Sequence, residues 1–267
     1  MRIGNKDFDR HTYVMGILNV TPDSFSDGGK FNRLDAAISH AEKLVRDGAD
    51  IIDIGGESTR PNYTQISDEE EIARIAPVIE RVKKEIDVPV SVDTYKHRVA
   101  KAAIDAGADM INDIWGLKYD SGEMADLIAK SNLPCCLMHN RRDTEYKSFI
   151  EEVIADLQET VKIAKSAGVA DDKIILDPGV GFAKSYEQNL TMIKNISRLN
   201  ELGYPVLLGT SRKSVIGLTL NLPSDERLEG TIATTVMAVI NGCRFVRVHD
   251  ALENKRAILM TEAILQS

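Results

Sequence analysis

The chain has 267 residues, with 33 Lys and Arg against 41 Asp and Glu, which gives a formal net charge of −8. A net acidic chain without a basic block lacks the charge that binding to nucleic acid or to a membrane surface requires, so we expect neither partner. Any anionic ligand must instead be held by a local cluster of donors.

Several features predict a cytoplasmic location. The longest uncharged stretch, residues 230–243, is about 14 residues long, whereas a bilayer span needs ~20 apolar residues. Residues 1–10 carry charges throughout and contain no apolar segment of the kind found in signal peptides. The three cysteines, two of them adjacent at Cys135 and Cys136, predict buried thiols in a reducing compartment and no disulfide framework.

Short β-branched runs alternate with longer stretches of helical period along the whole chain. The eight expected strands cover residues 13–18, 50–54, 88–92, 110–111, 134–138, 173–176, 205–208 and 245–248. Between them, spacings such as Ile72, Ile75 and Ile79 predict helices with one apolar face. Ser67 and Glu70 predict a capping box where that helix begins.

This order of elements predicts a (β/α)8 barrel (TIM barrel), in which right-handed crossovers close a parallel sheet. Repeating units of roughly 33 residues account for most of the length. A doubly wound open sheet is the structural alternative. Because the chain contains no linker and no shift in composition, we expect a single domain over residues 1–267.

Polar residues follow almost every expected strand. In a barrel, the carboxyl ends of the strands meet at one shared mouth. The residues at these ends are Asn19, Asp53, Asp93, Asn112, His139, Asp177, Ser211 to Lys213, and Arg247 with His249. Each of them alone can be interpreted as a turn residue or a helix cap. Eight separate caps around one rim explain the pattern less well than one polar site does.

The residue types divide this predicted site into two halves. One half supplies N–H and O–H donors suited to a phosphate or diphosphate. These donors are Asn19, Lys213, Arg247 and His249, with Thr59 near them. The other half, Asp93, Asn112 and Asp177, suits an amino-substituted flat heterocycle, since a carboxylate accepts two N–H groups side by side. We therefore expect carboxylates on one side and cationic donors on the other, around a heterocycle with a phosphorylated arm.

Other common catalytic and nucleotide-binding motifs are absent. The sequence contains no G-x-x-x-x-G-K-[ST] loop, and residues 179–184 lack the third glycine of a dinucleotide fingerprint. The histidines and cysteines show no zinc-ligand spacing. No serine lies in a G-x-S-x-G context.

Two long segments resemble the signatures of the dihydropteroate synthase family. The first, Met15 to Gly28, reads Met-Gly-Ile-Leu-Asn-Val-Thr-Pro-Asp-Ser-Phe-Ser-Asp-Gly, and the second, Asp53 to Pro61, reads Asp-Ile-Gly-Gly-Glu-Ser-Thr-Arg-Pro. The likeness continues through residues 91–94, 111–114, 137–139, 177–184, 210–213 and 247–249. It covers essentially the whole chain in order.

The resemblance implies a folate-pathway transferase of the class that sulfonamides target. Such an enzyme joins 6-hydroxymethyl-7,8-dihydropterin diphosphate to 4-aminobenzoate and releases diphosphate. The implied pterin-binding residues are Asp93, Asn112, Ile114, Met138, Asp177 and Lys213. The implied diphosphate-binding residues are Asn19, Thr59, Arg247 and His249, with Asn19 also holding Mg²⁺. The implied 4-aminobenzoate-binding residues are Thr59, Arg60, Pro61, Phe182, Ser211 and Lys213.

The resemblance also implies that Asp93, Lys213 and Arg247 carry the catalysis, and that two copies form a homodimer through barrel helices. An arylamine is a poor nucleophile, so we expect the C–O bond to break first and leave a pterin cation. The chain departs from the family pattern at Asn62 and in the short stretch 140–143. Both positions lie in loops, so they bear on the affinity for 4-aminobenzoate more than on the reaction.

Two other functions fit part of the pattern. A methyltetrahydrofolate-dependent corrinoid methyltransferase has a similar barrel and pterin slot, but it needs no diphosphate cluster. A non-catalytic pterin-binding barrel would keep the slot without turnover. The two loop signatures, together with Arg247 and His249, favour the synthase over both.

Overall fold

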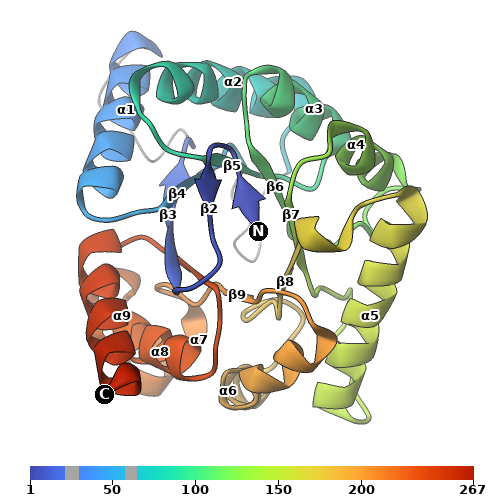
Figure 1. Ribbon diagram of the computed structural model, residues 1–267, viewed down its shortest axis with the longest axis vertical. Coiled ribbons are helices and arrows are strands. Elements are labelled where there is room, and N and C mark those ends of the chain that lie inside the picture. Colours follow the sequence, from blue (N-terminus) through green and yellow to red (C-terminus); the bar gives the residue numbers. More distant parts are fainter. Residues whose placement is uncertain (22–29, 58–64) are drawn as a thin grey trace.

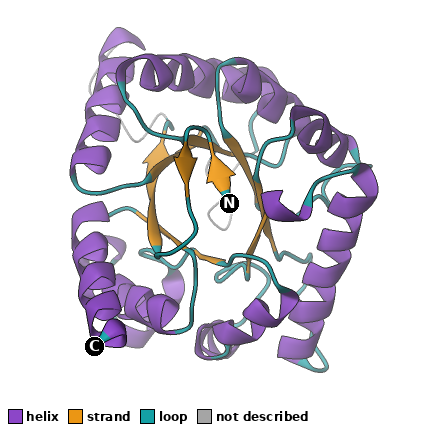
Figure 2. Cartoon of the chain, viewed as in Figure 1, coloured by secondary structure: helices purple, strands orange, loops and turns teal. Residues whose placement is uncertain are grey.

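The computed structural model describes residues 1–21, 30–57 and 65–267 as a ring of parallel strands surrounded by helices (Figure 1, Figure 2). The strands of the ring are β3 (Tyr13–Asn19), β4 (Ile51–Gly55), β5 (Val90–Asp93), β6 (Met110–Asp113), β7 (Cys135–Met138), β8 (Ile174–Asp177), β9 (Leu207–Leu208) and β10 (Phe245–Val248). They pair in the order β8-β7-β6-β5-β4-β3-β10-β9. Leu176 pairs with Val206 between β8 and β9, which closes the ring and confirms the predicted (β/α)8 barrel.

Each of the eight expected strand ranges overlaps an observed strand. At residues 205–208, only Leu207 and Leu208 form a regular strand. Pro205 has no N–H to donate to a ladder. Its carbonyl accepts from the N–H of Leu176 at 2.9 Å and thereby helps to close the barrel.

The helices lie outside the ring and follow the strands in turn. They are α1 (Lys30–Arg46), α2 (Asp68–Glu85), α3 (His97–Asp105), α4 (Glu123–Ser131), α5 (Phe149–Ala167), α6 (Tyr186–Lys194), α7 (Ser214–Leu220), α8 (Leu228–Ile240) and α9 (Ala251–Gln266). Short 3-10 helices cover Asp171–Lys173, Ile196–Leu202 and Ser224–Glu226. Within the described residues, no helix is long and apolar enough to cross a membrane.

The capping box predicted at Ser67 is only half formed. The Ser67 side chain accepts from the N–H of Glu70 at 3.1 Å, but the Glu70 carboxylate pairs with Arg74 one turn along the helix. A complete capping box occurs instead at Ser185 and Gln188, where α6 begins. The exposed Glu70 carboxylate forms an i,i+4 ion pair with Arg74 in place of a hydrogen bond to the backbone of Ser67.

A short hairpin that the sequence analysis missed covers the amino-terminal end of the barrel. Its strands are β1 (Arg2–Ile3) and β2 (Lys6–Asp7), and Figure 1 shows it across the centre of the ring. Ile3 and Phe8 pack into the barrel interior against Met15 and Phe245. This apolar plug closes the amino-terminal end, so the polar strand ends lie at the opposite end.

Candidate active site

The alternation of side chains along each strand places the polar strand ends above the apolar plug. In four strands a residue of the plug is followed two positions later by a buried or half-buried polar residue. These pairs are Ile51 with Asp53, Met110 with Asn112, Ile175 with Asp177 and Phe245 with Arg247. Because side chains two apart share one face of a strand, these polar groups point into the barrel. They come from strands β4, β6, β8 and β10, which lie around the ring.

Arg247 joins two of these carboxylates. Its Nε donates to Asp53 Oδ2 and its Nη2 to Asp93 Oδ2, each at 2.6 Å. Asn112 Nδ2 donates to the same Asp53 oxygen at 3.1 Å. The expectation of carboxylates on one side and cations on the other is therefore wrong for Arg247, which lies between the acids. Two carboxylates buried side by side need a cation, because each unpaired buried charge is costly.

The electrostatics of Asp93 depend on this contact. Burial raises the pKa of the Asp93 carboxyl to about 7, against the opposing effect of Arg247 and with a further rise from Asp53. Asp93 Oδ1 and Asp53 Oδ1 are buried and have no hydrogen-bond partner among the described residues. Asp53 is fully buried whereas Asp93 keeps a small exposed fraction, so Asp93 is the carboxylate of the pair that can offer an acceptor to a ligand that carries N–H groups.

Asp177 and Lys213 lie on the other side of Arg247. A methyl group on Gly209 would lie 3.5 Å from Asp177 Oδ2 and 3.9 Å from both Lys213 Nζ and the Arg247 Cβ, so the three side chains surround one glycine. Asp177 Oδ1 accepts from the N–H of Gly179 at 2.7 Å. Burial raises the pKa of Asp177 and lowers the pKa of Lys213 to about 8, while their mutual attraction opposes both shifts.

An apolar wall adjoins these polar groups. Tyr95, Ile114 and Met138 form a buried cluster of their own, and Trp115 and Phe182 pack against it. The Lys213 ammonium lies 4.8 Å from the centre of the Phe182 ring, within cation–π range. The apolar wall and Asp177 thus both adjoin Lys213. Such an arrangement suits a flat ring whose face is apolar and whose edges are polar.

The remaining predicted donors lie at neighbouring strand ends. Ser211 Oγ is 3.0 Å from His249 Nδ1 and accepts from the His249 N–H at 3.1 Å. Asn19 ends β3, and its Oδ1 lies 3.8 Å from the position of a methyl group on Gly55, where Asp93 Oδ2 lies 3.7 Å away. The structure thus places Asn19 and Asp93 on the two strands that flank Gly55. Thr59, Arg60 and Pro61 lie outside the described residues, as does Asn62.

A buried ion network near the mouth was missed by the sequence analysis. Lys96 Nζ lies 2.7 Å from Glu57 and 2.8 Å from Glu71, and the Tyr95 hydroxyl donates to Glu57 at 2.7 Å. Glu57 also accepts from the N–H of Ile66 at 2.9 Å. The network connects the apolar wall, through Tyr95, to the residue that precedes segment 58–64. Glu57 was visible as a strand-end acid, whereas nothing in the sequence distinguishes Lys96 from a surface lysine.

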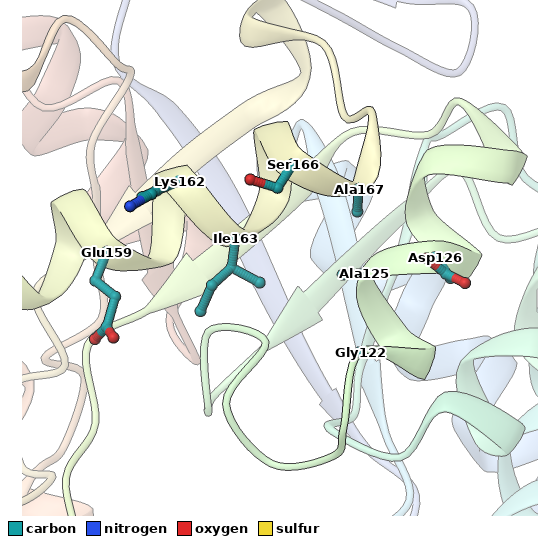
Figure 3. A pocket seen from close by; sticks show the side chains of 8 residues that line it. All are labelled: Gly122, Ala125, Asp126, Glu159, Lys162, Ile163, Ser166 and Ala167. Atoms are coloured by element: carbon teal, nitrogen blue, oxygen red, sulfur yellow. The ribbon is translucent and has the colours of Figure 1, made fainter.

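A separate groove lies between α4 and α5, with Ala125, Ile163 and Ala167 among its lining residues (Figure 3). None of the polar strand-end residues lines it. The groove is a feature of the helical layer, and it forms no part of the converging site.

Comparison with known proteins agrees with this geometry. Residues 15–249 match the family described as "Pterin binding enzyme". The dihydropteroate synthase of Clostridium beijerinckii is 60% identical over 269 residues, which is 100% of this chain and of the relative. That of Bacillus subtilis is 54% identical over 97% of this chain and 90% of the relative.

Two solved structures are similar over nearly the whole chain. Dihydropteroate synthase from Clostridium difficile, solved in the presence of pteroic acid, gives a TM-score of 0.95 at 51% identity and covers 98% of this chain and 100% of that chain. The Xanthomonas albilineans enzyme, solved with 4-aminobenzoic acid, gives 0.92 at 42% identity, with 96% and 94% covered. By sequence and by structure, this chain belongs to the dihydropteroate synthase family of pterin-binding enzymes.

Proposed function

We infer that this chain is a dihydropteroate synthase: a transferase of folate biosynthesis that condenses 6-hydroxymethyl-7,8-dihydropterin diphosphate with 4-aminobenzoate to give 7,8-dihydropteroate and diphosphate. The observation that carries this conclusion is the convergence of Asp93, Asn112, Asp177, Lys213 and Arg247 inside one barrel, in a chain 60% identical to a synthase of that name. We propose that residues 1–267 form one domain.

In this proposal the pterin lies against the carboxylates and the apolar wall. Asp177 accepts N–H groups of the ring, and Asp93 accepts others through its unpartnered Oδ1. Asn112 offers an amide, although its N–H is engaged by Asp53. Lys213 donates to a ring acceptor, while Ile114 and Met138 cover the apolar face. A ring that bonds to these fixed groups is held in one orientation.

The diphosphate lies beyond the pterin, toward Asn19 and His249, with Thr59 assigned to the same end. Arg247 uses Nε and Nη2 for the two carboxylates, and among the described residues its Nη1 contacts neither of them, so Nη1 is the group proposed to donate to the anion. Asn19 supplies a carbonyl oxygen across Gly55 from Asp93, and such an oxygen suits Mg²⁺, an ion that takes few protein ligands and completes its shell with phosphate oxygens and water. When bound, the ion would neutralise charge on the diphosphate.

4-Aminobenzoate is assigned to the side of Lys213 that faces away from the pterin. Phe182, whose ring stacks on the Lys213 ammonium, offers an aromatic face, and Ser211 offers a hydroxyl. Thr59, Arg60 and Pro61 complete the proposed set. The carboxylate of this substrate requires donors, which Ser211 and Arg60 supply.

The reaction is proposed to begin with cleavage of the C–O bond between the pterin methylene and the diphosphate. Donors fixed on the leaving group act where negative charge develops, and each such donor is worth roughly 10²–10³ in rate. Asp93, fixed and negative, stabilises the positive charge that the pterin ring takes up. The amine of 4-aminobenzoate then attacks the methylene carbon and loses a proton.

The pH dependence of kcat/KM is expected to be bell-shaped. Because burial raises the pKa of Asp93 to about 7, its negative charge is lost as the pH falls through that value. Because burial lowers the pKa of Lys213 to about 8, its ammonium is lost as the pH rises through that value. Initial rates at low substrate concentration report groups of the free enzyme. A maximum between the two values supports the assignments, and a profile that is flat from pH 6 to pH 9 contradicts them.

The direct test of the function is release of diphosphate. The protein is mixed with the dihydropterin diphosphate, 4-aminobenzoate and Mg²⁺, and each component is omitted in turn. The proposal requires release that depends on both organic substrates. A methyltetrahydrofolate-dependent methyltransferase would release no diphosphate, and a non-catalytic pterin-binding barrel would bind the pterin without turnover.

We also propose that two copies form a homodimer, in the cytoplasm. Exposed apolar side chains gather on the neighbouring helices α7, α8 and α9, which lie together at the lower left of Figure 1. They are Leu218, Leu220, Met237, Ile240, Leu259, Met260, Ile264 and Leu265. A second copy would remove such a surface from water. The cytoplasmic location is supported by three cysteines that are buried free thiols.

Ile240→Glu is expected to shift the dimer toward monomer, because it places a charge in the centre of the proposed contact. The mass in solution, measured by sedimentation, reports the change. Lys162→Glu is the matched control and should leave the mass unchanged, because Lys162 is exposed and belongs to α5, which lies across the ring from α9 in Figure 1. A wild-type chain that stays monomeric at high concentration would refute the dimer.

A further inference from the structure

Lys184 is buried behind the turn that follows β8, and the mechanism above assigns it no role. Its Nζ lies 2.8 Å from His139 Nδ1 and donates to the carbonyls of Gly179 and Phe182, each at 3.0 Å. An ammonium group has three N–H bonds. Each therefore has one acceptor, and none of the three is a carboxylate. Burial lowers the pKa of Lys184 to about 7, so below that pH its positive charge is directed at the backbone of the turn.

His139 fixes the direction of this ammonium. Its Nε2 lies 2.9 Å from Asp156 Oδ2, and the same oxygen accepts from Arg141 Nε at 2.5 Å. Burial lowers the pKa of His139 to about 4, so the ring is neutral near pH 7. With its proton on Nε2 toward Asp156, the ring presents Nδ1 as an acceptor to Lys184. Asp156, His139 and Lys184 thus form one chain of contacts from α5 to the turn.

The turn at residues 179–183 has its carbonyls bound by side chains from outside it. Besides the two bonds from Lys184, the Val180 carbonyl accepts from Lys213 Nζ and the Ala183 carbonyl from the Tyr146 hydroxyl, the latter at 2.9 Å. Gly179 is fixed as well, because a Cβ there would lie 2.0 Å from the His139 carbonyl. The shape of the turn is set by these donors and by close backbone packing.

We propose that Lys184 is a positioning residue for the transfer: its ammonium holds the turn at 179–183 in the shape that places Phe182 and Lys213 against 4-aminobenzoate. Lys213 depends on the turn because its Nζ donates to the Val180 carbonyl and lies 4.8 Å from the centre of the Phe182 ring. The inference rests on the proposed function, which assigns 4-aminobenzoate to these two side chains.

The first test compares the two substrates. Lys184→Met removes all three N–H donors and keeps the length of the side chain, and Lys162→Met is the matched change at an exposed lysine. We expect the KM for 4-aminobenzoate to rise at least about tenfold in Lys184→Met, with the KM for the dihydropterin diphosphate changed by less than about threefold. Asp93 and Asn112 hold the pterin from β5 and β6, with no hydrogen bond to the turn within the described part of the chain. Among the other polar pterin-binding groups only Asp177, through the Gly179 N–H, and Lys213 contact the turn, so the smaller change is expected for the pterin. If Lys184 had a merely structural role, the KM values for both substrates would rise alike, and that result would overturn the proposal.

The second test does not need activity. The N–H of Phe182 donates to the Gly179 carbonyl at 3.0 Å, and that of Gly181 to Asn189 at 2.7 Å. In Lys184→Met we expect hydrogen exchange at these two amides to accelerate while exchange in α5 stays unchanged. Unchanged exchange at the turn would overturn the proposal, whether or not the wild-type chain releases diphosphate. Failure of the wild type to release diphosphate would instead refute the proposed function.

Lys184→Gln, which keeps two N–H donors, is made in parallel in case the methionine variant does not fold. It should show the same preferential loss of 4-aminobenzoate affinity with a smaller magnitude. Equal KM ratios in Lys184→Gln and the wild type would count against the positioning role.

Discussion

Asp93→Asn is expected to lower kcat by about 10²–10³ while the variant still binds a diphosphate-free pterin. Asparagine keeps the size of the side chain and an oxygen for the ring, but it carries no negative charge to stabilise the pterin cation. Arg247 contacts the carboxylates of Asp53 and Asp93, and in this variant only the Asp53 carboxylate remains.

Steady-state rates and calorimetric binding of 6-hydroxymethylpterin measure the two halves of this prediction. Asp50→Asn is the control with the same change of residue type. Asp50 lies just before the amino-terminal end of β4 and pairs with Lys255, away from the mouth. Near-normal turnover in Asp93→Asn would show that the negative charge of Asp93 is not needed to stabilise the pterin cation. Loss of pterin binding together with turnover would reassign Asp93 to binding alone.

Removal of Arg247 is expected to damage both stability and activity. Arg247→Ala leaves the Asp53 and Asp93 carboxylates buried without their shared cation, which costs about 3–5 kcal/mol of the free energy of unfolding. It also removes a donor from the leaving group, so kcat/KM should fall by roughly 10²–10³. Denaturant unfolding and initial rates check the two values.

Arg247→Lys separates these two effects. Lysine keeps the positive charge but lacks the planar fork that donates to both carboxylates at once. We expect this variant to recover much of the stability while kcat/KM remains low. Its affinity for diphosphate should fall more than its affinity for a diphosphate-free pterin. Equal losses for the two ligands would mean that the substitution disturbs the whole mouth.

The residues at the strand ends were predictable from the sequence, because every second residue of a strand faces the same side. Ile51 and Asp53 stand two apart, as do Ile175 and Asp177, so the apolar plug and the polar site follow from one alternation. The hairpin at Arg2–Asp7 was not predictable in the same way. Its strands have two residues each, too few to show any period.

The partners of the charged residues could not be read from the sequence. Arg247 meets Asp53 across 194 positions of the chain, and only the closed ring brings them together. Lys96 and Lys184 belong to residue types that are mostly exposed, and their burial depends on packing between loops. The sequence located the mouth of the barrel, whereas the pairing of charges within it required coordinates.

We propose that residues from separate strands form one site for a pterin, and a crystal structure with bound 6-hydroxymethylpterin is the decisive test. We expect the ring to lie against Ile114 and Met138, with its N–H groups donating to Asp177 and to Asp93 Oδ1, and with Lys213 at its edge. A ring bound anywhere else, or one that leaves Asp93 and Asp177 without contact, would contradict it.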